Sequence, residues 1–191
     1  MNIGLMIIIG IVFFLIVIVV YIISIYNNIV KEKNKCENAW SQIKVQLMRR
    51  YDLIPNLVET VKGYMKHERE TLERVIQARN IASNTLNSNQ INETIKNDNI
   101  LTGALKSLFM VFERYPDIKA NQNAMALQEE ITSTENKIAF ARQHYNDNVM
   151  FYNTFIQTFP QNIIANFFNF QKFEFFDLET SEAAKRPEIK F

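Results

Sequence analysis

Hydrophobic and polar positions divide this chain near residue 30. From Leu5 to Ile23 the sequence reads LMIIIGIVFFLIVIVVYII, and the first charged side chain is Lys31. A helix rises about 1.5 Å per residue, so residues 3–26 would span roughly 35 Å, enough to cross a bilayer core with some tilt. A lone segment in lipid must satisfy its own backbone hydrogen bonds, which a helix does. We therefore predict a transmembrane anchor over residues 1–30, helical at about 3–26.

A cleaved secretory signal is the main alternative for this segment. Such a signal has a basic start, an apolar run of about 7–15 residues and a small-x-small cleavage site. Here the start is Met1-Asn2, the run is longer, and no Ala-x-Ala follows. A buried helix of a soluble protein is less favoured, because every face is apolar. Lysines at 31, 33 and 35 then predict that the N-terminus lies outside and the main domain in the cytoplasm.

Beyond residue 30 the apolar side chains follow helical spacing. From Cys36 to Ile54 they recur at steps of three and four, and the omitted step falls on Arg50. We expect this helix to continue from the anchor, because no Gly or Pro intervenes. Pro55 disfavours helix at the residue before it and can begin a new helix, so we expect a break there.

Three further helices are expected in the central part of the chain. The first is a charged helix over His67–Arg79, and the second a short amphipathic helix over Ile100–Phe112. The Asn- and Ser-rich stretch Asn80–Asn99 is interpreted as a frayed helix end and a loop. The longest helix is expected over Asn121–Phe159.

A heptad seam runs along this longest helix. Its positions alternate in threes and fours: Ala124, Leu127, Ile131, Thr134, Ile138, Ala141, Tyr145, Asn148, Tyr152, Phe155 and Phe159. Thr134, Ala141 and Asn148 are poor seam residues for a free dimer. The pattern therefore favours packing against helices of the same chain over a two-stranded coiled coil.

Together these elements predict an all-α protein. A transmembrane helix is followed by an antiparallel bundle of four to five long helices over residues 31–160. Pro160 ends the long helix, and residues 161–191 are expected to form a short helix and an extended aromatic tail packed on the bundle. For this tail a groove of the bundle is favoured over contact with the membrane surface.

Composition narrows the function classes. Lys and Arg number 21 against 20 Asp and Glu, a formal net charge of +1 that gives no general attraction to nucleic acid. Only Gly63 and Gly103 lie beyond the anchor, which argues against β-meanders and phosphate-binding loops. Cys36 is the sole cysteine, so an intrachain disulfide or a multi-Cys zinc site is impossible.

No constellation of catalytic residues emerges from the sequence. His67 and His144 are the only histidines, and His67-Glu68 is not followed by the second His of HExxH. Tyr64 and Ala141 stand where a Glu-x-x-His pair of a di-iron bundle would need Glu. We therefore expect no catalytic, cofactor-binding or metal site, and a protein that is not an enzyme.

Several short motifs occur in a recognisable order. They include RRxDLIPNLV from Arg49, ExYP from Glu113 and ARxxYN from Ala141, and their key residues are Trp40, Asp52, Pro55, Asn56, Tyr115, Pro116, Tyr145, Tyr152 and Pro160. In this respect nearly the whole chain resembles the LemA family, mostly bacterial membrane proteins with an N-terminal anchor and a helical bundle. The resemblance implies a single-pass protein with a small outside N-terminus, and it implies no particular chemistry.

Charged and amide side chains beside the apolar positions form the candidate site. Arg50 lies on the seam among apolar residues, where it must snorkel or find a carboxylate. The candidate set is Arg49, Arg50, Glu68, Arg79, Glu113, Glu135, Arg142, Asn146 and Asn153. One hypothesis is a polar network between helices that fixes the bundle register. The other is a groove that recognises a peptide or an anionic headgroup.

These observations favour a protein that acts by binding. We expect a scaffold at the inner membrane that contacts the lipid bilayer through residues 3–26 and holds a membrane or envelope protein. The alternative is a self-assembling protein that organises or shapes the membrane, and so a homo-oligomer. No nucleic-acid partner and no cofactor are expected.

Overall fold

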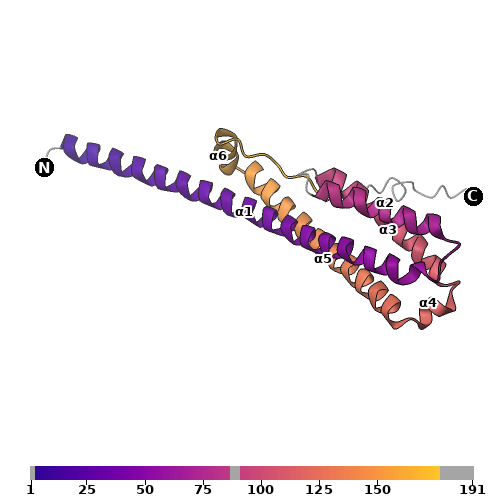
Figure 1. The fold of residues 1–191 in the computed structure, drawn as a ribbon. Coiled ribbons are helices and arrows are strands. Elements are labelled where there is room, and N and C mark those ends of the chain that lie inside the picture. The colour runs from indigo at the N-terminus through magenta and orange to yellow at the C-terminus, as the bar shows by residue number, and fades with distance from the viewer. Residues whose placement is uncertain (1–2, 87–90, 177–191) are drawn as a thin grey trace, which may run out of the picture. The chain divides into compact units, whose positions relative to one another are not determined.

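The computed structural model describes residues 3–86 and 91–176. Its helices, shown in Figure 1, are α1 (Ile3–Lys62), α2 (Arg69–Leu86), α3 (Ile91–Phe112), α4 (Pro116–Ala120), α5 (Gln122–Gln157) and α6 (Gln161–Phe167). The described ranges hold no strand, so the predicted all-α class is confirmed. The expectation of an extended end at residues 185–191 lies outside these ranges.

The described residues form two compact units. One contains residues 3–39 and 144–175, and the other contains residues 40–86, 91–143 and Phe176. Helices α1 and α5 each contribute a segment to both units. The two units are called the anchor unit and the network unit below.

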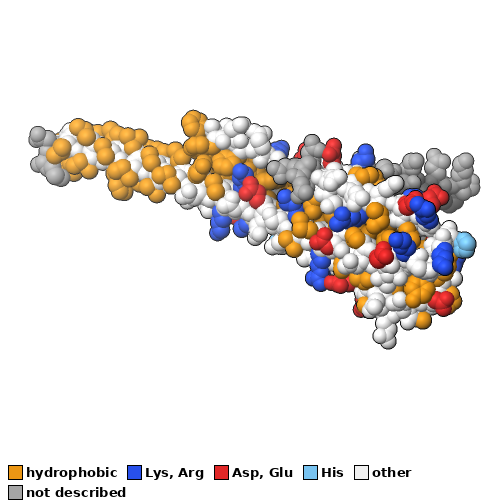
Figure 2. All heavy atoms as spheres, viewed as in Figure 1, with side chains coloured by type: hydrophobic (Ala, Val, Ile, Leu, Met, Phe, Trp, Pro, Cys, Tyr) orange, Lys and Arg blue, Asp and Glu red, His pale blue; other side chains and the backbone are white. Residues whose placement is uncertain are grey.

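Helix α1 is 60 residues long and continues from the apolar segment without interruption, as predicted. From Ile3 to Tyr21 every residue is exposed, and Figure 2 shows this stretch covered with hydrophobic side chains. Within the described ranges α1 is the one helix long and apolar enough to span a membrane. The long apolar N-terminal helix is therefore confirmed.

The predicted helix break at Pro55 is wrong, because Pro55 lies inside α1. A proline within a helix cannot donate to the carbonyl four residues earlier, here that of Tyr51. In this protein the guanidinium of Arg79, on α2, donates to the Tyr51 carbonyl instead, with Nε 2.9 Å from the oxygen. A hydrogen bond from a neighbouring helix thus satisfies the acceptor that the proline leaves unpaired.

The prediction of a frayed helix end and a loop over Asn80–Asn99 is also wrong for most of these residues. Helix α2 continues to Leu86 and α3 begins at Ile91, leaving only residues 87–90 between them. The buried positions that continue the helical spacing include the polar residues Thr94 and Asp98. A search for apolar periodicity misses such positions, and the Asn-rich composition then favours a loop.

Helix α5 carries the expected long seam over most of its length. Ala124, Ile131, Thr134, Ile138, Tyr145 and Tyr152 are buried. Towards its C-terminal end the buried face moves to Val149 and Ile156, and Phe159 is 74% exposed. The short helix α4 before it was not predicted; Pro116 occupies its first turn.

Asn121 caps the N-terminus of α5. Its Oδ1 accepts hydrogen bonds from the backbone N–H groups of Asn123, at 3.0 Å, and Ala124, at 3.1 Å. Its Nδ2 donates to the Tyr64 hydroxyl at 3.2 Å. This one side chain thus begins α5 and joins it to the turn after α1.

Replacing Asn121 by Ala should lower the free energy of unfolding by about 1 kcal/mol, the usual cost of losing an N-cap. The measurement is thermal unfolding of the detergent-solubilised chain, followed by the fluorescence of Trp40. Asn123→Ala serves as the control, because that exposed side chain makes no capping bond in the described structure. An equal loss in both variants would contradict the capping role.

Candidate functional site

A buried carboxylate lies at the centre of the network unit. Asp98, on α3, is 0% exposed, and Arg50, on α1, is 1% exposed. Arg50 Nη2 donates to Asp98 Oδ1, and the hydroxyl of Tyr51 donates to the same oxygen at 3.0 Å. Arg142, on α5, donates from Nη2 to Asp98 Oδ2 at 2.8 Å. One carboxylate therefore bonds three side chains and joins α1, α3 and α5.

The two guanidinium groups have further contacts. Arg50 Nη1 lies 3.3 Å from Thr102 Oγ1, and the guanidinium carbon of Arg142 lies 4.4 Å from the centre of the Phe176 ring. The Nε atoms of both arginines are buried and find no acceptor among the described residues. Two positive groups thus share one buried negative group, and the aromatic face of Phe176 adds a cation–π contact.

The buried environment fixes the protonation of Tyr51. Desolvation raises the pKa of its hydroxyl well above the ordinary value, and the negative charge of Asp98 raises it further. Desolvation also lowers the pKa of Arg142, while the carboxylates of Asp98 and Glu135 oppose that shift. Tyr51 therefore stays neutral and keeps its proton for the bond to Asp98.

Of the predicted candidates, the structure brings Arg50 and Arg142 to Asp98, whereas Arg79 contacts the backbone of Tyr51. Arg79 is bonded to the Tyr51 carbonyl, and its Nη2 lies 3.7 Å from Asp52 Oδ1. Because Arg50 and Asp98 are closed to solvent, they offer no open face to a ligand. This burial favours the hypothesis of a network that fixes helix register.

Three of the remaining charged candidates form separate ion pairs outside this network. Arg49 pairs with Glu130 at 2.5 Å, Glu68 with Arg114 at 3.2 Å, and Glu113 with Lys119. These are solvated pairs between largely exposed side chains, a class that contributes about 0–1 kcal/mol each. Glu135 is half-buried on α5, and its charge raises the pKa of Arg142 against the larger effect of desolvation. Asn146 is also half-buried on α5.

Sequence reasoning missed the central residue, Asp98, together with its partners Tyr51 and Thr102. A signal for Asp98 was present, because it follows Ile95 by three residues and precedes Leu101 and Leu105 at helical spacing. An acidic residue on an apolar helix face, together with the unpaired Arg50 on another, predicts such an ion pair.

A second set of candidates holds the extended segment after α6, within the anchor unit. The amide of Asn153 pairs with both backbone groups of Phe173: Nδ2 donates to its carbonyl at 2.9 Å, and Oδ1 accepts from its N–H at 3.0 Å. The hydroxyl of Tyr152 donates to the Gln171 carbonyl at 3.0 Å, and that of Tyr145 to the Glu174 carbonyl at 2.9 Å. We call Tyr145, Tyr152 and Asn153 the α5 clasp.

The other motif residues serve local structure. Pro160 precedes α6 and Tyr115 precedes α4, which begins at Pro116. The Asn56 carbonyl accepts a hydrogen bond from the Thr60 hydroxyl at 2.7 Å, as a helix backbone does. The Trp40 ring lies 6.1 Å from that of Phe176, which also contacts Arg142.

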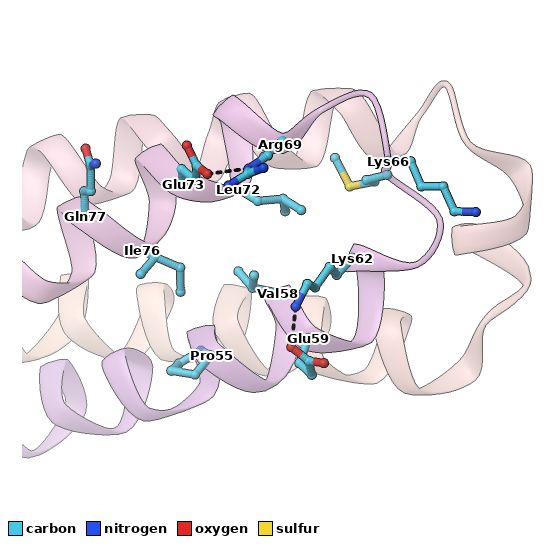
Figure 3. A pocket seen from close by; sticks show the side chains of 11 residues that line it. Pro55, Val58, Glu59, Lys62, Lys66, Arg69, Leu72, Glu73, Ile76 and Gln77 are labelled. Atoms are coloured by element: carbon cyan, nitrogen blue, oxygen red, sulfur yellow. Dashed lines mark hydrogen bonds and ion pairs between the residues drawn. The ribbon is translucent and has the colours of Figure 1, made fainter.

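A groove opens between the end of α1 and the start of α2 (Figure 3). Its volume is about 780 Å³, and the side chains of Pro55, Val58, Met65, Leu72 and Ile76 form its apolar part. The charged residues around it are Glu59, Lys62, Lys66, Arg69 and Glu73. Lys62 pairs with Glu59 at 3.7 Å and Arg69 with Glu73 at 2.7 Å, so four of these charges are paired along their own helices.

Within the described ranges, no group of three or more His, Cys, Asp or Glu side chains could hold a metal ion. The arrangement can fix helix positions at Asp98 and accept an apolar segment in the groove.

Comparison with known proteins places this chain in a family. The family model for the LemA family matches residues 39–191, so the chain belongs to the LemA family, as its motifs predicted. A curated relative is Protein LemA of Metamycoplasma hominis, which is 28% identical over 165 residues, covering 82% of this chain and 74% of the relative.

Replacing Asp98 by Asn should destabilise the protein strongly, because it leaves the buried guanidinium of Arg50 without a counter-charge and removes a carboxylate partner from Arg142. We expect a loss of about 3–5 kcal/mol in the free energy of unfolding, measured by chemical denaturation in detergent. The control is Asp52→Asn, whose carboxylate is 70% exposed and should cost less than about 1 kcal/mol. Similar losses from both substitutions would contradict a central role for Asp98.

The Cys36 thiol should resist ionisation in the folded protein. Desolvation, followed by the charges of Glu32 and Glu37, raises its pKa from 9.0 to about 11. The folded pKa lies above the unfolded one, so the protonated thiol contributes to the stability of the folded protein. This contribution is complete below pH 9 and is lost as the pH rises towards 11. Thiolate absorbance should appear near pH 11 in the native chain and near pH 9 in denaturant. Coincident titrations would contradict this burial.

Proposed function

We propose that this chain is a single-pass scaffold of the inner membrane that binds another membrane or envelope protein without catalysis. Residues 3–26 anchor it, with the N-terminus outside and the remaining chain in the cytoplasm. Support for anchoring comes from the uninterrupted exposed apolar surface of α1 from Ile3 to Tyr21. The lysines at positions 31, 33 and 35 support the orientation.

The observation that carries the binding proposal is the groove between α1 and α2. Its size and its apolar part suit one face of an amphipathic helix, which would pack between the two helices as a third. Charged residues of both signs surround it, three basic and two acidic. These surrounding charges favour a helix whose outer face is polar. The proposed occupant is therefore an amphipathic segment of a membrane or envelope protein.

The buried network is connected to the groove through the backbone of α1. Tyr51 joins the two, because its hydroxyl bonds Asp98 and its carbonyl accepts from Arg79 of α2. Pro55, which frees that carbonyl, also lines the groove. The Arg79 bond therefore ties α2 to α1 beside the groove, which supports a preformed binding site.

A photoreactive amino acid in place of Glu59, which lines the groove, should cross-link the full-length protein in cells to a discrete partner. The matched control is the same amino acid at Met48, a position on α1 that is 52% exposed and lies outside the groove lining. The adduct at position 59 should disappear when Val58 is replaced by Asp. Mass spectrometry should identify a membrane or envelope protein.

Two outcomes would count against this proposal. Absence of an adduct at position 59, or an adduct that survives Val58→Asp, would show that the groove is not the binding surface. An adduct to a second copy of the same chain would instead favour the alternative function, self-assembly at the membrane.

A further inference from the structure

The apolar side chains at and around α6 point outward. Phe159, Ile163 and Phe167 are 74%, 56% and 80% exposed, and Phe168 is 48% exposed. Within α6 itself, Ala165 is the buried residue. A seven-residue helix with its large apolar groups in solvent is unfavourable unless another apolar phase covers them.

Contacts within the anchor unit fix where this apolar surface lies along α1. The ring of Tyr26 is 4.8 Å from that of Phe168 and 5.6 Å from that of Phe170. Tyr26 directly follows the long apolar run of α1. Nearby, α1 changes from fully exposed to partly covered, since Ile25 is 6% exposed and Ile29 is 0% exposed. Helix α6 therefore lies beside the point where a spanning helix would leave the hydrocarbon.

Basic side chains lie next to this aromatic layer. Lys33 and Lys172 line one hollow of about 370 Å³ together with Tyr26 and the segment 168–173. Along α1 the apolar run is thus followed first by the aromatic rings and then by the lysines. Hydrocarbon, the interfacial layer and lipid phosphates succeed one another in the same order across a leaflet.

We propose that residues 159–170, including α6, form a second membrane contact that lies in the interfacial layer of the leaflet where α1 emerges. The occupant of this surface is the bilayer itself, at the boundary of acyl chains and headgroups, with anionic phosphates beside Lys33 and Lys172. Continuity with the exposed apolar surface of α1 selects lipid over a soluble partner. This inference rests on the proposed anchoring of α1.

Nitroxide spin labels can test this contact in the full-length chain. Cysteines are introduced one at a time as Phe167→Cys on α6, Phe13→Cys in the apolar run and Phe140→Cys on α5. Phe140 is the matched control, because it is 75% exposed and belongs to the network unit. Native Cys36 is 0% exposed, so the unsubstituted chain serves as the unlabelled reference. The protein is reconstituted in vesicles of phosphatidylcholine and phosphatidylglycerol.

The readout is the ratio of oxygen accessibility to water-soluble nickel-chelate accessibility. We expect this ratio at position 167 to exceed that at position 140 several-fold and to lie below that at position 13. A ratio at 167 equal to that at 140, with 13 high, would overturn the interfacial contact and leave the anchor intact. A low ratio at 13 would overturn the anchor and this inference with it.

One further result would also overturn the proposal. Low accessibility of position 167 to both reagents, with spin–spin broadening between labels, would show that a second copy of the chain covers α6 instead of lipid.

Discussion

The network unit depends on neutralising buried arginine charge. Arg50 occupies a seam position on α1 that would otherwise take an apolar side chain, and it is closed to water. An unpaired guanidinium there would cost several kcal/mol, so the fold must deliver a carboxylate to it. Asp98 supplies that group from α3, and Arg142 on α5 shares it. Three helices are thereby held in one register.

Backbone chemistry connects this network to the groove. Pro55 leaves the carbonyl of Tyr51 without its helical donor, and Arg79 replaces that donor from α2. The same tyrosine donates its hydroxyl to Asp98. Tyr51, Pro55 and Arg79 are therefore parts of one structure, since Arg79 donates to the carbonyl that Pro55 leaves without a helical donor.

The sequence predicted the helical class, the continuation of the apolar segment into a helix as far as Pro55, and the long α5. Apolar periodicity and the scarcity of glycine both indicate helices. The sequence also identified Arg50, Arg79 and Arg142 as unusual. It could not place Asp98, because the carboxylate lies in a stretch whose composition resembles a loop and whose partners are distant in the chain. The groove escaped prediction for a related reason: Pro55 was expected to end the helix that lines it. Helix boundaries depend on tertiary donors such as Arg79, which local spacing does not reveal.

The α5 clasp has a consequence for how this chain can vary. Tyr145, Tyr152 and Asn153 hold residues 171–174 through carbonyl and N–H groups, which every amino acid except proline provides in full. Lys172 and Glu174 are exposed side chains on that segment. Because the clasp bonds only main-chain groups, a change of side chain at either position would leave these bonds in place.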